Sequence, residues 1–347
     1  MRVRALVLAL IVLAACANDI VSLGGVRQID TWQQAPTDEV DILFVVDNSN
    51  SMELEQNLLA AGFDAFISRV DEANIDFHLG VITTAFLYDD PDRGVLRGDP
   101  RILTRDSTRI DANTGELLDY VGLFRERALV GLRGSGREKG LEAASFALST
   151  TMTSTGGPNE GFLRPSANLL VVFVSDEDDC SDEGRLGAEA DNLDCYRKSE
   201  LLTPVSTFVR RFEALKGNER VVQVAAIVGL QDARSVCAQT TQPGLRYIEL
   251  AEALNGLSNS ICESEAVWRD FLFTLGLNAS GILTVFELSS GVKDGTLEVY
   301  VDDVLQVEDP ENGFTFDPET RTITFHGDGV PPRGSQIRAE YEAAIGT

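Results

Sequence analysis

The chain has 347 residues, of which 44% are hydrophobic and 24% charged, a balance typical of globular domains with room for a sizeable core. Its formal net charge of −26 comes from 55 Asp and Glu residues against 29 Lys and Arg residues. Such an acidic surface repels a phosphate backbone and attracts cations, so the composition argues against nucleic acid as a partner.

Residues 1–15 have the form of an export signal. Two Arg residues precede an apolar run over 5–13, which is shorter than the roughly 20 residues that a membrane-spanning helix needs. The run ends in Leu-Ala-Ala-Cys16, which resembles the lipobox of bacterial lipoproteins, where the Cys is acylated and becomes the mature N-terminus. The alternative is an ordinary secretory signal with a chance Cys. Ala17 is not the Asp that retains lipoproteins at the inner membrane, so we expect a lipid anchor in the outer membrane, on its periplasmic or surface face.

Four further Cys residues remain, and an even number in an exported chain predicts two disulfides. Three pairings are possible, and pairing of sequence neighbours, Cys180–Cys195 and Cys237–Cys262, is the simplest. A zinc site is the alternative, but the chain has no C-x-x-C pair and 2 His residues.

Strands and helices are predicted to alternate from residue 38 to residue 280. Before them, residues 16–37 are polar with scattered Gly and Pro and are interpreted as a tether. The alternation predicts an α/β, Rossmann-like domain, with a mostly parallel central sheet and helices on both faces. Strands are predicted at 40–46, 75–84, 168–174 and 221–228, and helices at 52–70, 116–130, 139–148, 201–215, 247–254 and 266–275.

The pattern changes in residues 281–347. Five short segments rich in β-branched residues are separated by turn signals, with no helical period. This part is predicted to be a small all-β module.

Asp47, Ser49 and Ser51 follow directly after the apolar strand 40–46. In an open parallel sheet, ligands bind at the carboxyl ends of the strands. Side chains at alternate positions of an extended turn can face one point, and their hard oxygen atoms suit Mg²⁺, Mn²⁺ or Ca²⁺. The alternative is that these residues cap the following helix.

Two further segments favour the metal. Asp176 follows the second apolar strand, and Ser135 lies on a Gly-flanked loop before a helix. The combination resembles the von Willebrand factor A-domain family and its metal-ion-dependent adhesion site, in which an Asp-x-Ser-x-Ser loop, a Thr and a further Asp ligate one metal. The resemblance implies that Asp47, Ser49, Ser51, Ser135 and Asp176 hold a divalent cation, with Mg²⁺ foremost, and that a partner protein presents an Asp or Glu carboxylate to it.

The resemblance covers residues 38–278, and its SDEDDCS and GSGREKGLEAA segments are similar to a subgroup of bacterial lipoproteins with a β-rich tail. The sequence departs from the family at two points. Ser135 stands where the family has Thr, and Glu177-Asp178-Asp179 stands where the family often has Gly after the last Asp. We expect these extra carboxylates to lie in solvent, with a second cation site as the alternative.

We expect a binding protein, not an enzyme, and the alternatives are a metal-dependent envelope hydrolase or a structural envelope component without active metal binding. A haloacid-dehalogenase-type phosphatase needs Asp at position 49, where this chain has Ser. Serine chemistry needs a base, and both His78 and His326 lie inside predicted strands. No Gly-x-Ser-x-Gly, Walker or His-Glu-x-x-His motif is present.

Overall fold

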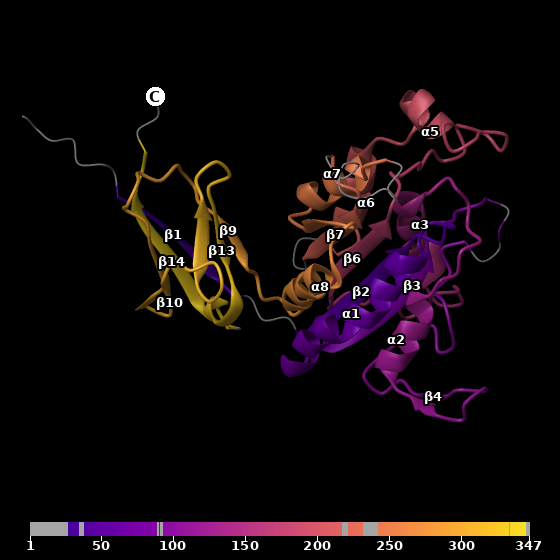
Figure 1. Cartoon of the computed structure of the whole chain (residues 1–347), viewed down its shortest axis with the longest axis horizontal. Helices are drawn as coiled ribbons and strands as arrows, with labels where there is room; N and C mark the ends of the chain where they lie inside the picture. The colour runs from indigo at the N-terminus through magenta and orange to yellow at the C-terminus, as the bar shows by residue number, and fades with distance from the viewer. Residues whose placement is uncertain are drawn as a thin grey trace, which may run out of the picture.

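The computed structural model describes residues 27–34, 38–88, 90, 93–216, 221–231, 242–332 and 334–344. It contains an α/β domain and a separate all-β module (Figure 1). In these residues, no helix combines the length and the apolar character that a membrane crossing requires. The export signal and Cys16 lie outside the described residues, so the lipid anchor stays a prediction.

The α/β domain is built on a five-stranded sheet in the order β3-β2-β6-β7-β8, in which every neighbouring pair is parallel. The four predicted strands are confirmed within one residue at each end. The sequence did not predict β8, because its Leu-Ser-Asn-Ser segment carries no apolar run. The strands are β2 (Glu39–Val46), β3 (Asp76–Thr83), β6 (Asn168–Ser175), β7 (Val222–Val228) and β8 (Leu257–Ser260).

Helices cover both faces of this sheet, as the fully apolar strands require (Figure 1). On one face, Phe44 packs edge-on against Phe66 of α1 and Phe124 of α2, and α8 completes the layer. Helix α8 lies so close to α1 that a Cβ on Gly276 would meet the Phe66 carbonyl oxygen at 2.1 Å. The other face is covered by α3, α6 and α7. The helices are α1 (Glu53–Glu72), α2 (Tyr120–Ala128), α3 (Gly140–Ala147), α4 (Thr150–Thr153), α5 (Asp194–Arg197), α6 (Val205–Glu213), α7 (Leu245–Ala253) and α8 (Glu265–Ala279).

A small all-β module follows α8. It consists of two sheets, β1-β14-β10-β11 and β12-β13-β9, which enclose a core of their own. A separate short hairpin, β4 (Arg109–Ile110) and β5 (Leu117–Leu118), belongs to the α/β domain. The strands after α8 are β9 (Val285–Glu287), β10 (Glu298–Val301), β11 (Val304–Leu305), β12 (Phe314–Asp317), β13 (Thr322–Phe325) and β14 (Gln336–Glu342).

Strand β1 (Arg27–Gln33) corrects the interpretation of residues 16–37 as a tether. It pairs antiparallel with β14 along its whole length, so the module contains more than residues 281–347. The side chain of Trp32 packs on Phe286, with ring centroids 5.4 Å apart. This strand escaped prediction because its residues alternate between exposed and half-buried, so that polar residues dominate its sequence.

Candidate metal centre

The carboxyl ends of β2 and β6 meet where the chain reverses its direction across the sheet. From β2 the chain crosses to β3 on one side, and it later returns to β6 on the other side of β2. Such a switch point is where open α/β sheets bind ligands. Asp47 follows β2 and Asp176 follows β6, and the N–H of Asp47 still donates to the Val174 carbonyl at 2.9 Å. The fold therefore brings these two carboxylates to one edge of the sheet.

The Asp47 carboxylate is fully buried and is oriented by hydrogen bonds. Its Oδ1 accepts from the Ser49 N–H at 2.7 Å, and its Oδ2 accepts from the Ser175 hydroxyl at 2.7 Å. Burial and, second, the charge of Asp176 raise the pKa of Asp47 to about 7. A cation beside this group would offset both effects.

The Ser49 and Ser51 hydroxyls face each other, with 3.0 Å between their oxygen atoms. Met52 is the residue before α1, and no side chain caps this helix. The helix-cap alternative therefore does not describe this loop. Burial raises the pKa of Asp176, and the nearby Ser51 hydroxyl and Asp47 side chain lower it by less.

The Asp176 carboxylate is buried without hydrogen-bond partners among the described residues. Its side chain is 1% exposed, and neither carboxylate oxygen has a hydrogen-bond partner of acceptable geometry among the described residues. An ordinary buried polar group without a partner costs roughly 1–3 kcal/mol of stability, and a charged group costs more. These two oxygens fit the donor set that a hard divalent cation requires.

The loop that carries Ser135 packs on the loop after β2. The Gly134 N–H donates to the Asn48 carbonyl at 2.7 Å, and a Cβ on Gly134 would meet Asn48 Oδ1 at 2.2 Å. The Ser135 hydroxyl accepts from the Arg137 N–H at 3.1 Å. The described hydrogen bonds do not join it to Asp47, Ser49 or Asp176, so its role as a ligand stays a prediction.

Glu138, on the same loop, was missed by the sequence reasoning. Its side chain is 1% exposed, Oε2 accepts from the Thr84 hydroxyl, and Oε1 has no partner among the described residues. Burial and, second, the charge of Asp47 raise its pKa well above the ordinary value. In the sequence its charged neighbours Arg137 and Lys139 make Glu138 look like a solvated surface residue.

The carboxylates of Asp47, Asp176 and Glu138 do not form a metal site by themselves. Across the described ranges, no three His, Cys, Asp or Glu side chains converge as metal ligands. A cation at this edge would therefore need the hydroxyls of Ser49 and Ser51 as well as Asp47 and Asp176, with water completing the shell.

The expectation that Asp178 and Asp179 lie in solvent is wrong. Asp179 is 1% exposed, forms an ion pair with Arg246 at 3.0 Å, and accepts from the Leu141 N–H at 3.0 Å. Asp178 accepts from the Arg246 N–H at 2.9 Å. These side chains tie the loop after β6 to α3 and α7 and are thereby satisfied within the protein.

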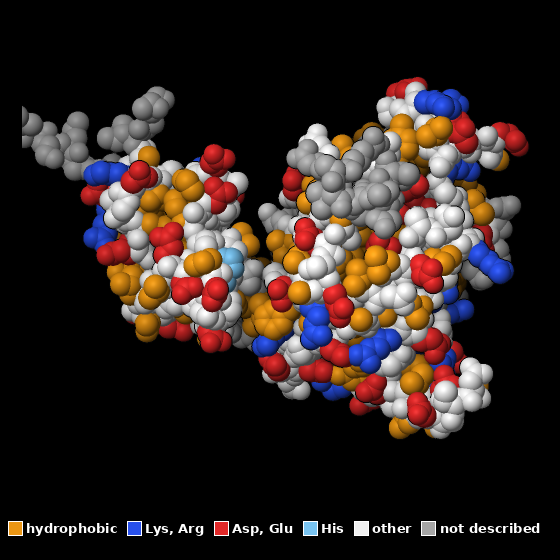
Figure 2. All heavy atoms as spheres, viewed as in Figure 1, with side chains coloured by type: hydrophobic (Ala, Val, Ile, Leu, Met, Phe, Trp, Pro, Cys, Tyr) orange, Lys and Arg blue, Asp and Glu red, His pale blue; other side chains and the backbone are white. Residues whose placement is uncertain are grey.

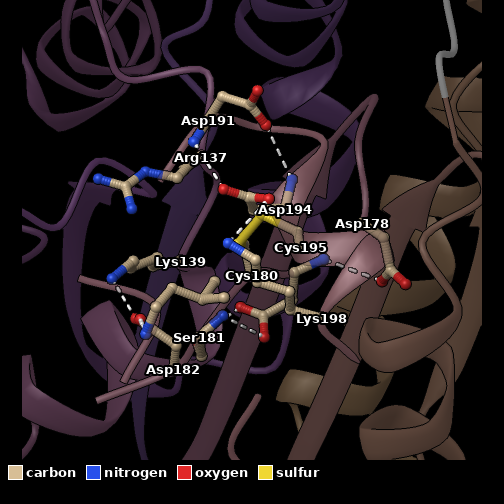
Figure 3. Close-up of a disulfide and its surroundings, with 12 residues drawn as sticks. Arg137, Lys139, Asp178, Cys180, Ser181, Asp182, Asp191, Asp194, Cys195 and Lys198 are labelled. Atoms are coloured by element: carbon tan, nitrogen blue, oxygen red, sulfur yellow. Dashed lines mark hydrogen bonds and ion pairs between the residues drawn. A yellow bond between two sulfur atoms is a disulfide. The ribbon is translucent and has the colours of Figure 1, made fainter. Parts of the chain in front are cut away.

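The same loop carries the disulfide Cys180–Cys195, which confirms the first predicted pairing, with 5.4 Å between the Cα atoms (Figure 3). Beside it, Lys139 and Asp182 form an ion pair that is almost completely buried. Cys237 lies outside the described residues, so the pairing Cys237–Cys262 stays a prediction.

The two histidines lie away from the centre. His78 is near the start of β3 and contacts the Phe162 carbonyl at 3.2 Å, whereas the centre lies beyond the end of that strand. At about 3.3 Å per strand residue, this is a separation of roughly 17 Å. His326 belongs to the β module and contacts Thr315 at 2.8 Å. Neither can therefore act as a base for Ser49 or Ser51 in this arrangement.

Comparison with known proteins found no matching family model and no matching curated protein. Among solved structures, the open form of the pilus adhesin SpaC from Lactobacillus rhamnosus GG aligns over 92% of this chain, with 11% identity and a TM-score of 0.41. The human COPII-coat protein Sec24c aligns over 90%, with 11% identity and a TM-score of 0.37. This chain covers 43% and 40% of those chains, respectively. Similarity at this level assigns neither a family nor a function.

Proposed function

We propose that this protein binds a divalent cation, foremost Mg²⁺, at the carboxyl ends of β2 and β6 and uses it to bind a partner protein. The proposal includes a lipid on Cys16 that holds the protein at the bacterial outer membrane. The parallel sheet of the α/β domain, with its switch point between β2 and β6, is compatible with the fold that the resemblance to von Willebrand factor A domains implies, and it supports the proposal.

The buried carboxylate of Asp176, which lies beside Asp47 and has no hydrogen-bond partner of acceptable geometry among the described residues, carries this proposal. Two like charges held together in a water-poor site destabilise each other unless one is protonated or a cation lies between them. Both residues are positioned by strand ends of a rigid sheet, and Asp47 is further fixed by Ser49 and Ser175. These contacts support the proposal, because carboxylates that are already positioned reduce the ordering cost of binding a cation.

Asp47 and Asp176 would bind the cation with the hydroxyl oxygens of Ser49 and Ser51. A bound cation with few anionic ligands supplies an open coordination position for an Asp or Glu carboxylate of the partner. The charge of Asp47 acts on Glu138, whose Oε1 has no hydrogen-bond partner among the described residues and would be available to the cation's hydration shell.

The position of β1 in the β module suggests which part of the protein would lie nearest the membrane. If Cys16 carries the lipid, ten residues separate it from Arg27, the first residue of β1. A fully extended chain of this length spans at most about 35 Å. The β module would therefore be the membrane-proximal part, and the metal centre on the α/β domain would be presented away from the membrane.

Capture from envelope extract tests the partner half of the proposal. Wild-type protein is compared in Mg²⁺ and in EDTA, beside Asp47→Asn and a matched exposed control, Asp270→Asn on α8. We expect one set of proteins to be retained by the wild type and the control in Mg²⁺, and to be lost with EDTA or Asp47→Asn. Retention of the same set under all four conditions would refute metal-dependent binding.

A further inference from the structure

A pocket of about 540 Å³ lies directly beside the metal centre. Asn48 and Ser135, from the two loops that meet at the centre, form part of its wall. The other described lining residues come from the end of β3, from the segment between β3 and β4, and from the loop of Ser135. A partner group bound at the centre would therefore lie next to this pocket.

The pocket is lined by three arginines, Arg97, Arg101 and Arg133, against one acidic residue, Asp90, among the described lining residues. None of the three arginines forms an ion pair with a described carboxylate; Arg101 donates to the Pro158 carbonyl at 2.8 Å. Partial burial lowers the pKa of Arg97. In a chain with a net charge of −26, these three arginines form a local cluster of cations without an ion-pair partner among the described carboxylates.

Buried polar side chains hold the arginine-bearing segment in place. Asn159 is 1% exposed, accepts from the Leu96 N–H at 2.9 Å and donates to the Gly94 carbonyl at 2.8 Å. Arg127, also buried, donates to the carbonyl oxygens of Pro100 and Arg101. The backbone of this wall is therefore fixed before any ligand arrives, which reduces the ordering cost of binding.

We propose that the partner presents an acidic peptide with two carboxylates, one for the metal centre and one for the arginine-lined pocket. This inference rests on the proposed function and names the chemistry of the partner's segment. A guanidinium group binds a carboxylate through paired, charge-assisted hydrogen bonds. Because the pocket adjoins the centre, a second carboxylate a few residues away in the same peptide can reach it.

The rest of the lining favours a peptide over an acidic polysaccharide. Leu87, Val95 and Leu96 supply small apolar surfaces that suit the methylene groups of Asp and Glu and neighbouring aliphatic side chains. Sugar rings are commonly bound on aromatic faces, and the described lining residues include no aromatic side chain. A peptide segment is therefore the occupant whose chemistry matches both the arginines and the apolar wall.

NMR titration of the full chain with synthetic peptides tests the inference. One peptide carries a single Glu in a Gly background, and the others carry two Glu residues at increasing separation. In Mg²⁺, we expect the best two-Glu peptide to bind about tenfold more tightly than the one-Glu peptide, since a charged hydrogen bond is being added. Arg97→Gln and Arg133→Gln should remove this gain and leave one-Glu binding unchanged, while Arg210→Gln, an exposed arginine outside the pocket, should change neither.

The outcomes separate this inference from the proposed function. Equal affinity for one and two Glu residues, or a gain that survives Arg97→Gln and Arg133→Gln, overturns the pocket while Mg²⁺-dependent binding stands. One-Glu binding that is indifferent to EDTA and to Asp47→Asn overturns the proposed function itself, and absence of binding by every peptide at millimolar concentration overturns both. Arginine-dependent binding of oligogalacturonate in place of the peptides overturns the peptide assignment. Arg133 is exposed, so Arg133→Gln serves if Arg97→Gln does not fold.

Discussion

Replacing Asp176 with Asn should raise the thermal stability of the protein without metal and remove the stabilisation that Mg²⁺ gives to the wild type. The pKa of Asp47 is raised from 3.8 to about 7, and a rise of this size corresponds to roughly 4 kcal/mol. Burial is the first cause and the charge of Asp176 the second, so removing that charge should contribute about 1–2 kcal/mol of stability at pH 8 without metal. For a domain of this size, the Tm in EDTA should therefore rise by about 2–8 °C.

In Mg²⁺ the wild type should have a higher Tm than Asp176→Asn, the reverse of the order in EDTA. A cation at a hundredfold excess over its Kd stabilises the wild type by about 2.7 kcal/mol. The Tm of the wild type should therefore rise by roughly 5–11 °C, and that of Asp176→Asn should hardly change. Asp270→Asn, an exposed carboxylate on α8, should behave as the wild type under both conditions.

The pH dependence follows from the direction of the Asp47 shift. The pKa of Asp47 in the folded state lies above the unfolded value of 3.8. The free-energy cost of ionising this buried carboxyl is therefore absent below about pH 4 and grows as the pH rises to about 7. In EDTA, this pair should lower the stability of the wild type across that window, and Asp176→Asn should reduce the slope. Scanning fluorimetry measures both effects. A lower Tm of Asp176→Asn in EDTA would refute the repulsion, and an unchanged Mg²⁺ response would refute the metal centre.

Three further predictions concern other parts of the chain. Lys216→Met removes a buried cation that lies 2.7 Å from the fully buried Asp41, so it should reduce the free energy of unfolding by about 3 kcal/mol in urea titration. An unchanged midpoint would mean that Arg164 alone compensates the charge of Asp41. Cys195→Ser opens a bridge of sequence separation 15 and should cost about 3 kcal/mol, as should reduction of the wild type, and no difference between oxidised and reduced protein would contradict this. Cys16→Ser should move the protein from the membrane to the soluble fraction after export, whereas membrane fractionation as in the wild type would count against the lipobox.

The surface charge of the α/β domain and the β module also bears on these experiments. Acidic and basic side chains are interspersed over the visible face of both bodies (Figure 2). The acidic excess is thus spread over this face, where solvent and salt screen it. Mg²⁺ effects that persist at high salt would therefore point to the buried centre and not to this diffuse surface charge.

Local pattern was sufficient for the strands of the α/β domain other than β8. The runs 40–46 and 168–174 contain apolar residues that point to both faces of a strand, so both faces had to be covered, and parallel strands with crossover helices meet that requirement. The position of Asp47 and Asp176 directly after these runs followed from the sequence as well. Their shared switch point did not, because strand order depends on contacts between distant segments.

The burial of polar residues was decided by tertiary structure. Glu138 and Asp179 are charged residues in polar stretches, and nothing in their local sequence distinguishes them from solvated carboxylates. They are buried because distant segments pack on them, namely Thr84 after β3 on Glu138, and α3 and α7 on Asp179. Similarly, β1 is a polar segment whose partner, β14, lies at the other end of the chain. The sequence by itself determined the apolar strands, the amphipathic helices and the hard oxygen ligands that follow two of the strands, but not the polar strands β1 and β8. The packing of distant segments decided which carboxylates are deprived of water, and this deprivation is what makes them a candidate cation site.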